Sequence, residues 1–184
     1  VGPTMIDAVM GIAKAYTTRV GSGPFPTELT DAVGQGLQER GREFGSTTGR
    51  ARRCGWYDAV VVRHAAQVNG LTSLAVTKLD VLDGCKELKL CVGYRHEGVL
   101  YKEMPSDLDV LMQCEPVYQR MKGWTASTTG ATTYKQLPAE AKRYLARIEE
   151  LADCRIDMIS TGSKRTETVT LRNPLKCSRR RPRS

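Results

Sequence analysis

The sequence predicts an α/β fold. Short apolar segments of strand character alternate with segments of helical periodicity, polar turns follow the strands, and 40% of the 184 residues are hydrophobic, enough to bury a core. No apolar run of about 18 residues occurs, so we expect no membrane span. The start has neither a signal-peptide pattern nor an initiator Met, which favours a cytoplasmic protein whose chain begins inside a longer one.

Four elements are predicted in the N-terminal half of the chain. Residues 12–20 read as a strand that the turn at residues 21–24 ends. Residues 56–68 predict a helix with one face formed by Trp56, Val60, His64 and Val68, which recur at spacing four, and Asn69 and Gly70 terminate it. Residues 71–78 read as a buried strand followed by a loop. Residues 88–94 alternate with period two, which predicts a strand with one face formed by Leu88, Leu90, Val92 and Tyr94.

The C-terminal half predicts a helix, a strand and a tail. Pro138 precedes a helix that runs to about Asp153, and a strand follows at residues 156–160. The helix carries an apolar stripe of Ala141, Leu145, Ile148 and Ala152. We therefore expect one domain over residues 1–175 and a disordered basic tail at residues 176–184.

Cysteine spacing and charge exclude two kinds of function. The six cysteines are scattered without a C-x-x-C pair, and only His64 and His96 could join them, so we expect reduced thiols rather than a zinc site. His64 is expected to be packed and hydrogen-bonded. Five charges of the +8 total lie in the tail, at Lys176, Arg179, Arg180, Arg181 and Arg183. The body is therefore only weakly basic, and we expect no specific nucleic-acid partner.

The segment at residues 46–53 (STTGRARR) is dense in groups that bind anions. Hydroxyls and exposed backbone N–H groups can hold a carboxylate, and guanidiniums bind carboxylate or phosphate through paired donors. Glycine allows the backbone to approach a ligand closely. A solvated basic loop remains the alternative interpretation.

The segment at residues 77–80 (TKLD) follows an apolar strand, where α/β proteins place ligand-binding loops. It resembles the guanine-reading motif of GTPases with Thr in place of Asn. A carboxylate such as Asp80 can accept hydrogen bonds from both N1–H and the exocyclic amine of guanine, and a lysine stem can cover the base. The alternative is a simple strand-end turn. Residues 160–162 also follow a strand and could contact the same base.

These segments occur together and in order with longer matches, and the chain resembles the C-terminal part of the adenylosuccinate synthetase family over about residues 12–174. The resemblance implies the C-terminal portion of a P-loop-NTPase-like fold, with a large central, mainly parallel sheet and flanking helices. It rests on residues 13–21 (AKAYTTRVG), 23–29 (GPFPTEL), 43–45 (EFG), 47–50 (TTGR), 54–56 (CGW), 77–84 (TKLDVLDG), 159–162 (ISTG) and 165–168 (RTET).

The resemblance also implies roles for particular residues. The loop that receives aspartate is expected to contain Ser46, Thr47, Thr48 and Gly49. Arg50 matches an arginine linked to IMP and aspartate, and Arg52 one linked to GTP and aspartate. Ala51 occupies a position that the family often fills with Lys, Arg or Pro. IMP is further expected to be bordered by Val20 and Gly21. Guanine recognition falls to Lys78, Leu79, Asp80, Ser160, Thr161 and Gly162.

The implied activity is that of a ligase forming a C–N bond in AMP biosynthesis and purine salvage. Its substrates are IMP, L-aspartate and the co-substrate GTP, with Mg²⁺ as cofactor and a homodimer as assembly. The family's phosphate loop, catalytic Asp and catalytic His have no match here, so this chain is expected to hold no catalytic or metal-binding residue and to be inactive alone. Two alternatives remain open: a related ligase that uses another purine nucleotide, and a noncatalytic binding module that relies on the basic tail.

Overall fold

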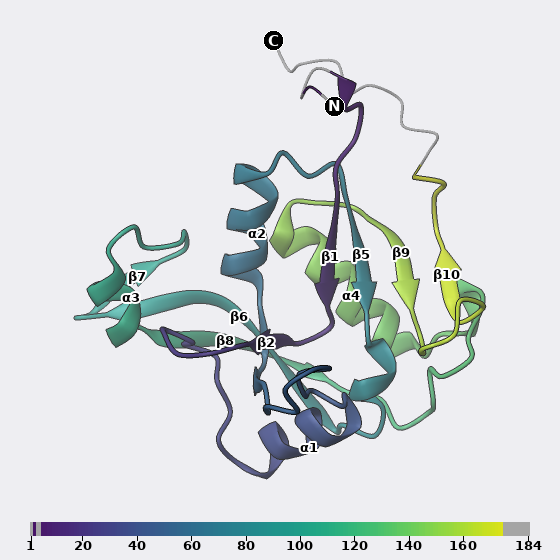
Figure 1. Cartoon of the computed structure of the whole chain (residues 1–184), viewed down its shortest axis with the longest axis horizontal. Helices are drawn as coiled ribbons and strands as arrows, with labels where there is room; N and C mark the ends of the chain where they lie inside the picture. Colours follow the sequence, from purple (N-terminus) through teal and green to yellow (C-terminus); the bar gives the residue numbers. More distant parts are fainter. Residues whose placement is uncertain (1, 3–4, 175–184) are drawn as a thin grey trace.

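A four-stranded sheet forms the centre of the fold in the computed structural model, which describes residues 2 and 5–174. Its order is β1 (Met10–Lys14), β5 (Ser73–Thr77), β9 (Ile156–Ser160) and β10 (Thr168–Thr170). The first three strands are parallel, and β10 is antiparallel to β9 (Figure 1). The predicted α/β fold with a mainly parallel central sheet is confirmed. The strand at residues 156–160 has the predicted bounds.

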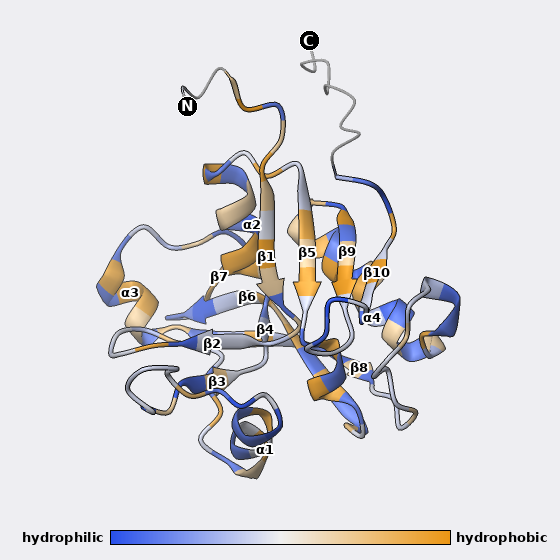
Figure 2. Ribbon diagram, turned by 45° about the vertical axis from the view of Figure 1, so that its right-hand side comes forward, coloured by the Kyte–Doolittle hydropathy of each residue, from blue (hydrophilic) through white to orange (hydrophobic). Residues whose placement is uncertain are grey.

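Helix α4 (Ala139–Ala152) covers one face of this sheet and also contacts α2 (Ala59–Val68) (Figure 1). The predicted stripe on α4 is confirmed, since all four of its residues are at most 2% exposed. Tyr144 on the same face donates a hydrogen bond of 2.8 Å to the carbonyl of Ala15. Figure 2 shows the hydrophobic strands that this helix covers. The main core therefore lies between α4 and the parallel strands.

A second sheet contains β4 (Tyr57–Asp58), β6 (Glu87–His96), β7 (Val99–Tyr101) and β8 (Glu115–Lys122). Helix α3 (Leu108–Gln113) precedes β8. The prediction of a single apolar face on β6 is wrong at Val92. The register against β8 passes from Cys91 to Gly93, so Val92 is the extra residue of a bulge and is only partly buried.

The predicted strand at residues 12–20 is two strands that belong to different sheets. β1 ends at Lys14, and β2 (Thr17–Arg19) pairs with β3 (Arg53–Gly55). Ala15 and Tyr16 between them are buried and hydrogen-bonded to distant segments: the Ala15 N–H donates to Thr77, and the Tyr16 hydroxyl donates to Glu43. The break depends on partners far away in sequence, which local periodicity does not contain.

Helix α2 begins three residues later than predicted. Asp58 caps it by accepting hydrogen bonds from the backbone N–H groups of Val60 and Val61. The predicted face is also wrong in part, because Trp56 and Val60 are buried whereas Val68 is 65% exposed. The expectation that His64 is packed is wrong, since its side chain is exposed. Apolar residues surround most of this helix, so their spacing alone did not select the buried face.

The remaining short elements are α1 (Ala32–Arg40) and the 3₁₀ turns η2 (Leu79–Leu82) and η3 (Tyr134–Gln136). Five described cysteines are free, which confirms the prediction of reduced thiols for them: Cys54, Cys85, Cys91, Cys114 and Cys154. Cys177 and the predicted basic tail lie outside the described residues. Within the described part, none of the helices has the length and apolar character needed to cross a membrane.

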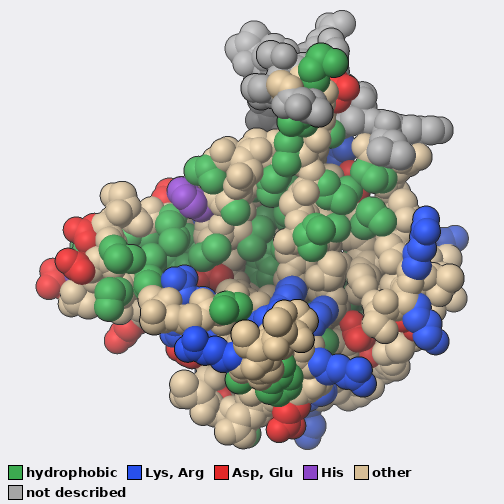
Figure 3. Space-filling view, viewed as in Figure 1, with side chains coloured by type: hydrophobic (Ala, Val, Ile, Leu, Met, Phe, Trp, Pro, Cys, Tyr) green, Lys and Arg blue, Asp and Glu red, His purple; other side chains and the backbone are tan. Residues whose placement is uncertain are grey.

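Strand β1 lies at one edge of the central sheet, and within residues 5–174 no strand pairs with its outer side. Its Ile12 side chain is 78% exposed. Figure 3 shows hydrophobic side chains at the surface over this strand and basic side chains below it, toward the loops that follow the parallel strands.

Candidate functional site

A cleft of about 610 Å³ opens where the central strands end. β5 and β9 are parallel neighbours, so the loops after Thr77 and Ser160 meet at the same edge of the sheet. The cleft thereby brings together four of the residues expected to bind guanine: Lys78, Asp80, Ser160 and Gly162. Sequence reasoning missed several other lining residues, among them Arg40, Arg42, Thr129, Lys164 and Glu167.

The loop after β5 turns sharply at Lys78, which adopts a left-handed conformation with φ of 60°. The turn directs Leu79 into the core, where it is fully buried, and leaves Asp80 at the cleft. Burial raises the pKa of Asp80, the nearby Asp83 and Glu167 carboxylates act in the same direction, and Lys78 opposes them. Leu79 thus holds the loop in place, while Asp80 faces the cavity.

The loop after β9 divides into residues that line the cleft and a residue that supports it. Ser160 and Gly162 line the cleft. Thr161 is fully buried; its hydroxyl donates 2.8 Å to the Ala131 carbonyl, and its N–H donates 2.9 Å to the Glu167 carbonyl. A Cβ on Gly162 would lie 2.3 Å from Oε2 of Glu167, so glycine allows that carboxylate to approach the loop.

The loop expected to receive aspartate has a fixed stem and an exposed tip. Phe44 pairs with Ala51 in an antiparallel bridge, and the Gly45 N–H donates 2.8 Å to the Arg50 carbonyl. Gly49 has φ of 64°, which closes the turn. The five tip residues are exposed: Ser46, Thr47, Thr48, Gly49 and Arg50. Their hydroxyl, guanidinium and backbone groups are therefore open to a ligand.

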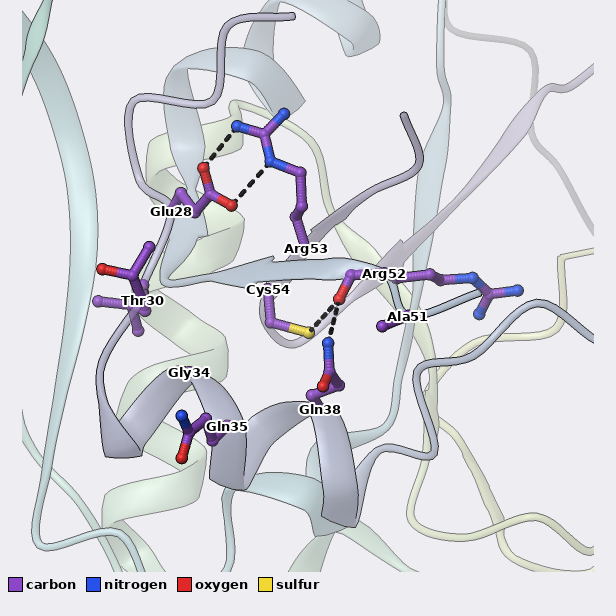
Figure 4. A pocket seen from close by; sticks show the side chains of 10 residues that line it. Glu28, Thr30, Gly34, Gln35, Gln38, Ala51, Arg52, Arg53 and Cys54 are labelled. Carbon is purple, nitrogen blue, oxygen red and sulfur yellow. Dashed lines mark hydrogen bonds and ion pairs between the residues drawn. The ribbon is translucent and has the colours of Figure 1, made fainter. Parts of the chain in front are cut away.

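Arg52 directly precedes β3, the strand that leaves this loop, and its backbone carbonyl is hydrogen-bonded to α1. In a pocket of about 180 Å³ between α1 and β3, Gln38 donates 2.7 Å to the Arg52 carbonyl (Figure 4). Figure 4 shows the guanidinium of Arg52 extending away from this pocket. It reaches Glu43, with 2.9 Å between Nη1 and Oε2. Gln38 in this small pocket thus holds the backbone of Arg52 in place.

Five residues form what we call the Glu43 cluster: Lys14, Tyr16, Glu43, Arg52 and Lys78. Glu43 is fully buried and accepts hydrogen bonds from all four others, at 2.8–2.9 Å from the three cationic groups. Burial alone would raise the pKa of Glu43, but these hydrogen bonds outweigh it and lower the pKa to about 2. Glu43 and Lys14 were not among the expected site residues, although both lie in segments that carry the resemblance.

Val20 and Gly21 lie apart from the guanine loops. Val20 is 71% exposed at the end of β2. Gly21 has φ of 77°, and its carbonyl accepts a hydrogen bond of 3.2 Å from Arg53. Neither residue lines the 610 Å³ cleft.

The part of the chain that the structure describes offers no fitting site for Mg²⁺. It contains no group of three or more His, Cys, Asp or Glu side chains that could hold a metal ion.

Comparison with known proteins shows which family this chain is similar to. A family model described as adenylosuccinate synthetase matches residues 1–169. Adenylosuccinate synthetase from Pseudomonas putida (strain W619) is 57% identical over 174 residues, covering 95% of this chain and 40% of that relative. The enzyme of the same name from Desulforamulus reducens is 55% identical over 171 residues, covering 93% and 40%. The chain thus spans about 40% of the length of these curated relatives.

A solved structure is similar as well. The fully ligated adenylosuccinate synthetase from Plasmodium falciparum superimposes with a TM-score of 0.89 at 36% identity, over 94% of this chain and 42% of that one. Fold and cleft together define an α/β protein with a P-loop-type fold and a cavity at the carboxyl ends of parallel strands. The chain belongs to the adenylosuccinate synthetase family, a family of ligases in purine biosynthesis.

Proposed function

We propose that this chain supplies the guanine-binding and aspartate-binding part of a GTP-dependent ligase that joins L-aspartate to IMP. The products are adenylosuccinate, GDP and phosphate. The observation that carries the proposal, beside family membership, is the cleft in which Lys78, Asp80, Ser160 and Gly162 converge.

Guanine is the base that fits this cleft. The carboxylate of Asp80 can accept from N1–H and the exocyclic amine, a donor pair that adenine lacks. The Lys78 ammonium is held by Glu43 and by the Gly41 carbonyl, which fixes its aliphatic stem beside the cleft. That stem offers an apolar surface for one face of the base. Selection of guanine therefore combines a hydrogen-bond acceptor, Asp80, at the edge of the base with the Lys78 stem over one of its faces.

In the proposed reaction, O6 of IMP attacks the γ-phosphorus of GTP, and GDP leaves. The amine of aspartate then attacks C6, and phosphate leaves with O6. In this scheme the tip residues Thr47 and Thr48 bind the aspartate carboxylates, while Arg50 and Arg52 orient aspartate toward the two nucleotides. The base and acid for IMP belong to family segments without a match in this chain.

The reaction is tested on the full-length gene product with IMP, GTP, aspartate and Mg²⁺. Formation of adenylosuccinate and GDP is expected. Failure to form adenylosuccinate would reject the proposal. A product formed only when another purine nucleotide replaces IMP would favour the related ligase.

The 184-residue chain alone is proposed to be inactive, because binding and orientation without a phosphate cradle, base and acid do not assemble a phosphoryl-transfer transition state. Within the described residues the outer edge of β1 pairs with no strand, and this edge with its exposed Ile12 should also favour aggregation. The measurement is a turnover assay on this polypeptide, free of host synthetase. Turnover that co-purifies with the chain and disappears in Arg50→Leu would overturn this part of the proposal.

The family resemblance further supports a cytoplasmic homodimer as the working form. Sedimentation of the full-length gene product should give twice the monomer mass. A monomer that retains full specific activity at assay concentration would contradict the dimer.

A further inference from the structure

One buried carboxylate joins the two parts of the candidate site. Oε1 of Glu43 accepts from the Lys78 ammonium at 2.9 Å, and Oε2 accepts from the Arg52 guanidinium at 2.9 Å. Lys78 lines the guanine cleft, whereas Arg52 closes the stem of the loop expected to receive aspartate. The side chain of Glu43 is itself fully buried, so it acts on these ligand-binding residues rather than on a ligand.

The backbone around Glu43 reinforces the same link. The Glu43 carbonyl accepts from the Arg52 N–H at 2.8 Å, so Arg52 is held by both its main chain and its side chain. The Glu43 N–H donates 2.8 Å to the Gln38 carbonyl at the end of α1. Lys78 in turn also donates to the Gly41 carbonyl, two residues before Glu43. The carboxylate is therefore anchored on a rigid turn, and movement of either partner would break a charge-assisted hydrogen bond.

The balance of charge makes this carboxylate hard to replace. Three cationic groups converge on it: Lys14, Arg52 and Lys78. Burial lowers the pKa of Lys14, and its hydrogen bond with Glu43 opposes that change. Without a negative charge at position 43, the three cations would repel one another and separate. The positions of Lys78 and Arg52 would then no longer be set together.

We propose that Glu43 is a positioning residue that fixes the guanine cleft and the aspartate loop relative to each other, an inference that rests on the function proposed above. This role differs from general structural support because the loss of the Glu43 carboxylate should weaken the binding of two substrates at once. GTP is affected through Lys78, and aspartate is affected through Arg52 and the loop stem.

The test is steady-state kinetics of the full-length gene product carrying Glu43→Gln, which keeps the shape of the side chain and removes its charge. KM for GTP and KM for aspartate should each rise by about tenfold, as expected for the loss of one charge-assisted hydrogen bond at each partner. A fall in kcat with both KM values unchanged would indicate a smaller folded fraction only, and would overturn the inference. A rise in only one of the two KM values would overturn it as well.

Asp157→Asn is the matched control. Asp157 is also fully buried and pairs with two arginines, Arg155 and Arg172, but it lies near the start of β9, away from the cleft. This variant should lose stability and keep both KM values. If it raises them as much as Glu43→Gln does, the effect is general loosening and the inference fails.

Glu43→Asp provides a second variant in case Glu43→Gln does not fold. It keeps the charge but shortens the side chain, so the carboxylate cannot reach Lys78 and Arg52 together, and both KM values should rise by a few-fold. Unchanged KM values in this variant would overturn the inference. Absence of adenylosuccinate from the unmodified protein would instead refute the proposed function.

Discussion

The folding stability that Glu43 contributes should depend on pH. Its pKa falls from the ordinary value of 4.5 to about 2 in the folded chain. A carboxyl group whose folded pKa is lowered stabilises the fold above its unfolded pKa and loses that contribution as the pH falls toward the folded value. At about 1.4 kcal/mol per pH unit, the difference between the two pKa values corresponds to about 3 kcal/mol. Of this, about 2 kcal/mol should disappear between pH ~5 and pH ~3.

Glu43→Gln isolates this contribution from other acids. Burial raises the pKa of Asp58 and of Asp80, and a raised carboxyl pKa has the opposite effect on folding stability in acid. Both groups are present in the unmodified protein and in the variant, so their contributions cancel when the two are compared. Near neutral pH the substitution should cost about 3–5 kcal/mol, as for breaking a buried ion pair. The penalty should shrink by about 2 kcal/mol at pH ~3.

The assay is urea unfolding at low protein concentration, followed by tryptophan fluorescence at both pH values. Glu150→Gln is the control, since the exposed Glu150 pairs with the partly buried Arg147 on α4, and this substitution should cost less than about 1 kcal/mol at either pH. If Glu43→Gln lowers the free energy of unfolding by the same amount at the two pH values, the reasoning is refuted. That result would mean that the ionisation of Glu43 is not coupled to folding.

Three further predictions concern single groups. Asp80→Asn in the full-length gene product should cost about 1–3 kcal/mol in GTP binding, because an amide donor then faces a donor edge; an unchanged preference for GTP over ITP would show that Asp80 does not read the exocyclic amine. Tyr144→Phe should cost about 1–3 kcal/mol in urea unfolding, because the buried Ala15 carbonyl loses its 2.8 Å donor; a cost near zero would mean that water replaces the hydroxyl. Gly123→Ala should destabilise by several kcal/mol, since its Cβ would lie 1.9 Å from the Cys85 carbonyl oxygen, which cannot rotate away; wild-type stability would contradict the packing of that turn.

Segments whose structure depends on neighbours in sequence were predicted well. The stripe on α4 repeats with helical period, and its residues are buried. The strand at residues 156–160 is short, apolar and bounded by polar turns. The position of residues 78–80 after a buried strand followed from the same local pattern and the parallel order of α/β folds.

Segments whose structure depends on distant partners were not predicted well from the sequence. The chain leaves the strand direction at Ala15 and Tyr16 because their hydrogen-bond partners include Thr77, Tyr144 and Glu43. The bulge at Val92 arises from the register with β8 and has no periodic signal of its own. The buried face of α2 is set by the elements that pack against this helix, α4 and β6.

By itself, the sequence determined the fold class, the family and the loops that carry the chemistry, because periodicity and local motifs are properties of neighbouring residues. Only the tertiary structure decided that Glu43 joins those loops. Its partners Lys14, Arg52 and Lys78 come from three separate segments, and a buried carboxylate is recognised as such only once all of its donors surround it.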